Sequence, residues 1–161
     1  MDILLTEKVK IMDKKIAVLV PCYNEEKSVA GVVAGFKKSL PNARIFVFDN
    51  NSTDKTSKYA IKAGAIVKKV NLPGKGNVVR RMFADIDADV YIMVDGDDTY
   101  DAKSAPKLVD KLLNEDLDMV VGCRVEDNKD NNNYRLGHRT GNKLLTGSVQ
   151  KMFGGNFTDM L

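Results

Sequence analysis

A regular alternation of short apolar runs and amphipathic stretches constrains the fold more than any other feature of this chain. Continuous apolar runs, rich in β-branched residues, predict buried strands over residues 16–20, 44–48, 65–70, 90–94 and 117–121. Apolar residues spaced three and four apart predict amphipathic helices over residues 29–40, 55–63, 72–86, 104–113 and 136–153. Strands that alternate with helices build a mostly parallel sheet, so we predict an α/β, Rossmann-like fold with helices on both faces.

The fourth apolar run leads directly into a cluster of carboxylates. Asp95 and Asp97 follow it and are separated by Gly96, which lets the backbone turn sharply. Two carboxylates this close repel each other unless a cation lies between them, and Mg²⁺ or Mn²⁺ is the natural candidate. The alternative is a solvated acidic turn that caps the next helix. An EF-hand calcium loop is excluded, because Tyr100 stands where that loop needs glycine and Pro106 where it needs glutamate.

Other unusual polar residues also follow predicted strands. In parallel α/β sheets, ligands bind outside the carboxyl ends of the strands. Tyr23 and Glu25 follow the first strand, Asp49 the second and Lys75 the third. Asp95 and Asp97 follow the fourth strand, and Arg124 follows the fifth. Because five strand ends would meet on one rim, the sequence favours a ligand site with a metal over a solvated turn.

Two carboxylates on this rim each have a functional and a structural interpretation. Asp49 could accept hydrogen bonds from a ribose or a base, or it could cap the following helix. Thr53 or Asp54 suits the cap better, so we expect Asp49 to be free for a ligand. Glu25 could contact the ligand, or it could be a first-turn carboxylate that the helix dipole favours.

Basic residues supply candidate contacts to phosphate. Lys75 stands between two glycines at a helix start, where it could contact a phosphate or a base. The segment matches neither a Walker A loop nor a dinucleotide-binding glycine motif. Arg124 could form a two-pronged contact with a phosphate. The last predicted helix carries a basic stripe that could face solvent, an anionic substrate or membrane lipid, formed by Arg135, Arg139 and Lys143.

Composition narrows the chemistry further. A net charge of +3 is too small to argue for nucleic-acid binding, and Cys22 and Cys123 show neither zinc nor disulfide spacing. His138 is the single histidine, so catalytic triads and zinc–histidine sites lack parts. The lead-in over residues 1–15 lacks a signal-peptide core, and no apolar run could span a bilayer. We therefore expect one cytoplasmic domain, residues 16–161, that binds a divalent ion and a nucleotide-diphosphate donor.

Several segments together resemble glycosyltransferase family 2. They occur in the family's order and spacing at residues 20–26, 48–56, 74–76 and 95–97. Within the family the chain is most similar to dolichyl- and polyprenyl-phosphate mannosyl- and glucosyltransferases, a likeness supported by residues 122–124, 139–142 and 153–159. The resemblance implies a GT-A fold and inverting transfer of a hexose from a UDP- or GDP-sugar. A polyprenyl or dolichyl phosphate at the membrane surface is the favoured acceptor.

The resemblance also implies roles for the matched residues. The nucleoside would be contacted by Pro21, Tyr23, Glu25 and Asp49. Asp95 and Asp97 would hold the metal and the diphosphate, while Arg124 and Arg139 would meet phosphates of the donor or the lipid. A lipid phosphate is already an anion, so it needs little help from a base, and catalysis is mainly positioning and leaving-group stabilisation. If the acceptor were a sugar hydroxyl, Asp159 would be the available base.

The chain departs from the family pattern at three places. Asn50 stands where the family often has a second aspartate, which leaves the nucleoside open, and Thr99 stands where some relatives have glutamine. The chain stops at Leu161, where relatives continue, so we expect an incomplete catalytic domain.

Two alternative functions remain open. One alternative is a sugar-1-phosphate nucleotidyltransferase, although residues 22–26 lack the glycine-rich basic loop that it needs. The other is a non-catalytic module that binds nucleotide sugars.

Overall fold

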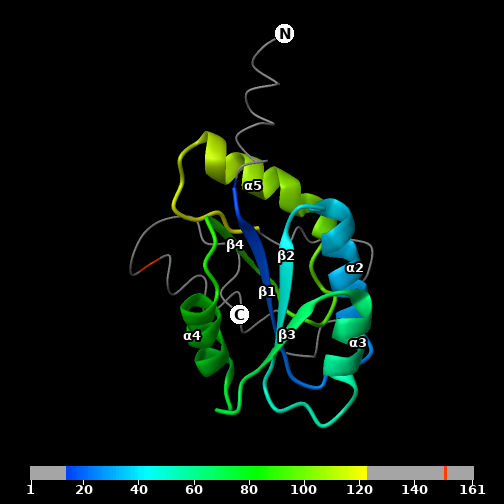
Figure 1. Cartoon of the computed structure of the whole chain (residues 1–161). Coiled ribbons are helices and arrows are strands. Elements are labelled where there is room, and N and C mark those ends of the chain that lie inside the picture. Colours follow the sequence, from blue (N-terminus) through cyan, green and yellow to red (C-terminus); the bar gives the residue numbers. More distant parts are fainter. Residues whose placement is uncertain (1–13, 123–150, 152–161) are drawn as a thin grey trace. The chain divides into compact units, whose positions relative to one another are not determined.

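The computed structural model describes residues 14–122 and residue 151 (Figure 1). By its internal contacts the chain divides into two units, residues 1–120 and residues 121–161. All the strands and helices named below belong to the first unit. Among the described residues, no helix is both long enough and apolar enough to cross a membrane.

Within the described residues, four parallel strands form the central sheet. They are β1 (Ile16–Cys22), β2 (Arg44–Asp49), β3 (Ile66–Lys69) and β4 (Val90–Met93), in the order β3-β2-β1-β4. Ala17 of β1 aligns with Arg44 on one side and with Tyr91 on the other. Because the strands run in one direction, their carboxyl ends meet at one edge, as the sequence pattern predicted.

Helices cover both faces of the sheet, which confirms the predicted α/β fold. Helices α2 (Val29–Ser39) and α3 (Thr56–Ala63) lie on one face, and α4 (Lys75–Asp85) lies on the other (Figure 1). A 3₁₀ turn, η1 (Ala102–Ser104), leads into α5 (Ala105–Asn114). Helix α5 packs at the amino ends of the strands, where Val109 contacts Ile16 and Val90.

The core follows from the alternation of side chains along β1. Val18, Val20 and Cys22 point to the face that α2 and α3 cover, where they join a cluster with Phe36 and Ala60. Ala17 and Leu19 point to the opposite face and join a cluster with Phe48, Val78 and Met82, under α4. Val18, Val20 and Leu19 are fully buried. The strand is apolar throughout because both of its faces are covered.

Three helix ends carry residues that are typical of these positions. Helix α3 ends at Gly64, whose φ of 91° favours glycine, and Pro106 lies in the first turn of α5. Ser104, the first residue of the predicted helix over 104–113, stands at the N-cap of α5. Its hydroxyl, however, donates to the Asp101 carboxylate (2.9 Å) and makes no capping hydrogen bond.

The predicted fifth strand over residues 117–121 is wrong. These residues are described and form no strand, and the side chains of Met119 and Val121 are 76% and 70% exposed. An apolar run becomes a strand only when a partner is available, and in the described part of the chain β4 is paired with β1 alone. The predictions for residues 1–13 lie outside the described residues, and so does the predicted helix over 136–153 apart from Lys151.

Candidate functional site

The candidate site lies at the carboxyl edge of the sheet, in the loops that follow the four strands. The order β3-β2-β1-β4 places β2 and β3 on one side of β1 and β4 on the other. The loops that follow β1 and β4 therefore lead away in opposite directions, which is where open α/β sheets form a ligand crevice. The acidic pair at the end of β4 lies at this point.

Gly96 lets the acidic pair approach the loop that follows β1. A Cβ atom added at this buried glycine would lie 2.6 Å from the Cys22 sulfur and 3.3 Å from Cγ of Glu25. Any larger residue would push the loops apart. The structure thus brings Glu25 against Gly96, the residue between Asp95 and Asp97, as expected for one rim. Asp97 is exposed, and its Oδ1 accepts hydrogen bonds from the backbone N–H and the hydroxyl of Thr99, at 3.1 and 2.7 Å.

Lys75 and Asp95 are also brought together. Lys75 is the first residue of α4, and its Nζ lies 2.5 Å from Oδ1 of Asp95. The Asp95 side chain is about one-third exposed, at 34%, and that of Lys75 is 62% exposed. Two residues predicted from separate motifs are therefore in direct contact at the carboxyl edge.

Hydrogen bonds join the loop after β1 to the loop after β2. Asn24, at a φ of 58°, accepts the backbone N–H of Thr53 (2.8 Å) and donates its own N–H to the Ser52 hydroxyl (3.0 Å). The backbone N–H of Glu25 donates to the Thr56 hydroxyl (2.8 Å). Tyr23, in the same loop, lies on the surface and is 62% exposed. Sequence reasoning did not select Asn24, although asparagine is one of the few residues that tolerate this backbone conformation.

Asp49 is not free, so the expectation drawn from the sequence is wrong on this point. Asp49 is only 5% exposed, and its two oxygens accept hydrogen bonds from the Ser52 backbone N–H (2.9 Å) and from the Ser57 hydroxyl. Asp54 does bond the Thr56 backbone N–H (2.9 Å) at the start of α3, as predicted. A single capping side chain does not satisfy every backbone N–H group near the start of a helix. Asp49 therefore accepts the N–H of Ser52 while Asp54 accepts that of Thr56. Its oxygens keep further lone pairs for a ligand.

Asn50 holds the loop that carries Lys75. Its Nδ2 donates to the carbonyls of Val70 (2.8 Å) and Leu72 (2.9 Å), and its Oδ1 accepts the Gly74 backbone N–H (2.8 Å). An aspartate could not donate the first two of these bonds. The departure from the family pattern at position 50 therefore has a structural reason. Gly74 itself has a φ of 111°, a conformation that side chains disfavour.

The charge balance of the crevice is negative close to β1. Burial, and after it the negative charges of nearby carboxylates, together raise the pKa of the Cys22 thiol to about 12; in order of effect the carboxylates are those of Glu25, Asp49, Asp95 and Asp54. The thiol is therefore neutral and is a poor nucleophile at physiological pH. The same carboxylates would attract a cation to the crevice.

The side-chain oxygens of the acidic pair are of the type that binds a hard divalent cation. Asp95 and Asp97 offer carboxylate oxygens, the ligand type that Mg²⁺ and Mn²⁺ prefer. Among residues 14–122, no three acidic, histidine or cysteine side chains come close enough to hold a metal by themselves. A cation at this site would need further ligands from water or phosphates, which is common for Mg²⁺.

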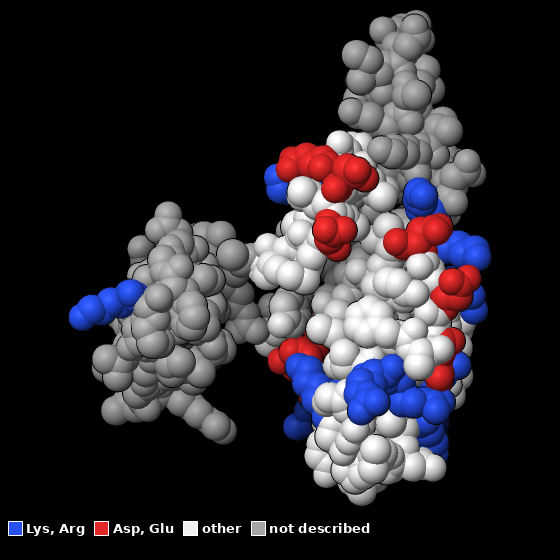
Figure 2. Space-filling model, turned by 90° about the vertical axis from the view of Figure 1, so that its left-hand side faces the viewer, with Lys and Arg blue, Asp and Glu red and all other residues white. Residues whose placement is uncertain are grey.

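Positive charge lies on the side of the crevice that α4 forms. In Figure 2, lysine and arginine side chains gather in a band across the lower part of the face shown, where α4 lies in Figure 1. Helix α4 contributes exposed Lys75, Arg80 and Arg81. Such a region attracts an anionic ligand toward the carboxyl edge.

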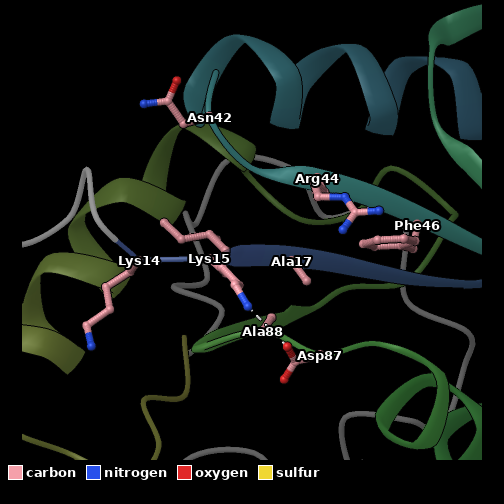
Figure 3. Close-up of a pocket in the computed structure, with 9 residues that line it drawn as sticks. Lys14, Lys15, Ala17, Asn42, Arg44, Phe46, Asp87 and Ala88 are labelled. Carbon is pink, nitrogen blue, oxygen red and sulfur yellow. Dashed lines mark hydrogen bonds and ion pairs between the residues drawn. The ribbon is translucent and has the colours of Figure 1, made fainter.

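A hollow of about 280 Å³ lies at the other end of the sheet and does not have the features of a binding site. Lys15 and Asp87 form an ion pair there (3.2 Å), and the Arg44 guanidinium stacks over the Phe46 ring. The side chains of Lys14 and Asn42 extend away from the hollow (Figure 3). A ligand would therefore meet few converging groups.

The structure places six of the rim residues predicted from the sequence, and they are gathered at the carboxyl edge: Tyr23, Glu25, Asp49, Lys75, Asp95 and Asp97. Pro21 is the last residue but one of β1 and is partly buried. Arg124, Arg139 and Asp159 lie outside the described residues.

Comparison with known proteins identifies relatives over most of the chain. Residues 17–160 match the family described as Glycosyl transferase family 2. The chain is 62% identical over 124 residues to protein RfbJ of Shigella flexneri, covering 77% of this chain and 95% of that one. It is 33% identical over 110 residues to the dolichyl-phosphate hexose transferase of Haloferax volcanii, covering 68% of this chain and 48% of the relative.

A solved structure shares the fold. Glucosyl-3-phosphoglycerate synthase from Mycobacterium tuberculosis, in complex with Mn²⁺, uridine-diphosphate and glucosyl-3-phosphoglycerate, aligns with a TM-score of 0.60 and 27% identity. The alignment covers 66% of this chain and 42% of the synthase. The chain thus spans almost all of protein RfbJ but less than half of the other two proteins.

Proposed function

This chain belongs to glycosyl transferase family 2, with the α/β fold of GT-A glycosyltransferases, and we propose that it transfers a hexose with inversion from a UDP- or GDP-sugar. One observation carries the proposal. The acidic pair at the end of β4 lies against the loop that follows β1, and Lys75 of α4 reaches Asp95. Carboxylates and a lysine therefore meet at the crevice of an α/β sheet, which is where such folds bind nucleotides. The carboxylates can bind a metal or the nucleoside, and the lysine can bind the diphosphate.

Each residue on the rim has a proposed task. Pro21, Tyr23 and Glu25 contact the nucleoside, and Tyr23 is exposed enough to stack on a base. Asp49 accepts a hydrogen bond from the nucleoside with a lone pair that Ser52 and Ser57 leave unused.

The acidic pair and Lys75 serve the diphosphate. Asp95 and Asp97 hold Mg²⁺ or Mn²⁺, in line with the Mn²⁺ and uridine-diphosphate present in the synthase structure. A divalent ion there stabilises the charge of the leaving nucleoside diphosphate. Lys75 adds a positive charge at the start of α4. The backbone N–H groups at the start of a helix also attract an anion.

The proposed acceptor is a polyprenyl or dolichyl phosphate. One relative carries the name dolichyl-phosphate hexose transferase, and a phosphate acceptor is already ionised. Such an acceptor needs no strong base, and the only histidine in the sequence is His138. Arg124 and Arg139 are proposed to meet the phosphates of donor or acceptor. Asp159 is the proposed base if the acceptor is instead a sugar hydroxyl.

The donor site is tested by calorimetric titration of UDP and GDP, each with and without Mn²⁺. We expect one nucleotide to bind tightly only when the metal is present. Asp97→Ala should weaken that binding by at least about 100-fold, since it removes a direct ligand rather than an outer partner. Asp87→Ala, an exposed carboxylate at the other end of the sheet, is the matched control. Metal-dependent binding that persists unchanged in Asp97→Ala would contradict the assignment.

The acceptor is tested by product formation. The protein is incubated with the labelled nucleotide sugar that it binds, together with either a polyprenyl phosphate or a free saccharide. Label in the lipid fraction supports the proposed acceptor, whereas label on the saccharide alone contradicts it. Nucleotide binding without product in either case would identify a non-catalytic binding module.

A further inference from the structure

The contact between Lys75 and Asp95 is held in place from two directions. Lys75 begins α4, and the loop before it is fixed by Asn50 through bonds to the carbonyls of Val70 and Leu72 and to the N–H of Gly74. Asp95 lies two residues beyond the end of β4, and Gly96 beside it packs against Cys22. The 2.5 Å ion pair therefore joins two restrained backbone segments.

The position of the Lys75 ammonium is also significant. Its Nζ contacts Oδ1 of Asp95. Carboxylate oxygens of this kind are also the ligands that a divalent cation prefers. The surrounding carboxylates, which raise the pKa of Cys22, would repel one another without a positive charge among them. Lys75 supplies that charge from within the protein.

We infer that Lys75 is a built-in counter-ion of Asp95 that competes with the divalent metal, so that metal and nucleotide bind cooperatively. This inference rests on the proposed function of the same site. In the free protein, Lys75 holds Oδ1 of Asp95, so a divalent cation that uses this oxygen has to displace the ammonium. A diphosphate gives the lysine another anion to contact, which releases Asp95. Each ligand therefore makes room for the other, and the coupling is the same from either side.

The primary test measures Mn²⁺ binding to the free protein by electron paramagnetic resonance, without nucleotide. Lys75→Gln should bind Mn²⁺ about fivefold more tightly than the unchanged protein, which is the upper range for a partly exposed ion pair. Lys58→Gln is the matched control, because Lys58 is exposed on α3 and forms no ion pair with the described residues. It should leave Mn²⁺ affinity unchanged. Equal or weaker Mn²⁺ binding by Lys75→Gln would overturn the inference.

A double-mutant cycle links the effect to Asp95. In an Asp95→Asn background, Lys75→Gln should change Mn²⁺ affinity by less than about twofold, because the lysine then has no carboxylate to leave. A full effect in that background would show that Lys75 acts elsewhere and would also overturn the inference. Circular dichroism melting curves confirm that each variant is folded.

The coupling itself is measured with UDP or GDP, whichever binds. In the unchanged protein, saturating nucleotide should raise Mn²⁺ affinity by a larger factor than in Lys75→Gln. Equal factors would contradict the inference while leaving the donor site intact. By contrast, Mn²⁺ binding that survives Asp95→Asn and Asp97→Ala together would remove the proposed metal site, which is a failure of the proposed function.

Discussion

The two ends of the same sheet differ in how their polar side chains are held. At the carboxyl end, Asn24 and Asn50 bond backbone groups that lie 20 to 29 residues away along the chain, and Asp49 is buried. At the amino end, Lys15 and Asp87 form an ion pair whose side chains are 71% and 92% exposed. Asn24, Asn50, Lys15 and Asp87 all lie outside the strands, so the difference lies in the loops.

This difference separates a prepared site from an ordinary surface. Side chains held by several hydrogen bonds keep their geometry before a ligand arrives, so less entropy is lost on binding. A solvated ion pair such as Lys15–Asp87 contributes little to stability and fixes little geometry. The carboxyl end is thus preorganised by more side chains than the amino end, where Asp89 accepts the Lys15 backbone N–H (2.7 Å) and the Tyr91 hydroxyl bonds the backbone of Ile86 and Ala88.

The largest expected effect follows from Gly96→Ala. The added Cβ would lie 2.6 Å from the buried sulfur of Cys22, so the two loops have to separate. We expect a loss of about 3 kcal/mol in the free energy of unfolding, measured with urea, from overpacking. Gly76→Ala is the matched control, since a Cβ there meets nothing within 4 Å and alanine favours the helix. Equal stability of the two variants would mean that the acidic loop is not held closely.

Asn50→Asp tests whether the preorganisation depends on side-chain donors. The substitution removes the two N–H donors to the Val70 and Leu72 carbonyls and places a negative charge against those oxygens. We expect unfolding free energy to fall by about 2 kcal/mol, together with weaker metal-dependent nucleotide binding. Unchanged binding, in the same calorimetric titration, would show that the Lys75 loop needs no such support.

The pH dependence of stability tests the electrostatics around Cys22. Its pKa is raised to about 12 in the folded protein from an ordinary value of 9.0, so the unfolded thiol ionises first as pH rises. The folded state binds the proton more tightly, and its advantage is present below pH 9 and is lost above it. Between pH 9 and pH 10 we expect a loss of about 1 kcal/mol, measured as the difference between the unchanged protein and Cys22→Ser. Parallel pH profiles for the two proteins would contradict this account.

The smallest expected effect is at the amino end. Lys15→Ala removes an exposed ion pair, so unfolding free energy should fall by no more than about 0.5 kcal/mol. Nucleotide affinity should not change. A tenfold loss of nucleotide binding in this variant would break the contrast between the two ends.

Much of the fold was predictable because it depends on local pattern. The four strands and helices α2 to α5 begin and end within a few residues of the predicted positions, since apolar periodicity and signals such as Gly64 act over short distances. The location of Asp95 and Lys75 on one rim also followed, because parallel strands share a carboxyl edge. The strand order could not be obtained in this way, because it depends on which strands pair.

The remaining differences depend on contacts between distant parts of the chain. The apolar run over residues 117–121 carries no information about whether a partner strand is present, and it forms no strand. The bonds of Asn50 and the engagement of Asp49 depend on how closely the loops approach, which only the folded backbone determines. Sequence reasoning therefore identified the charged groups of the site but missed the amides that hold them.

The register of the sheet has a consequence for the order of folding. Strand β1 pairs with β2 from Ala17 to Arg44, across a short stretch of chain, whereas its pairing with β4 joins Ile16 to Val90. Closing the longer loop costs more entropy, so we expect β4 to join the sheet after β1, β2 and β3 have paired. The acidic pair lies just beyond β4, and a nascent or partly opened chain would therefore keep most of its sheet while lacking the proposed metal site.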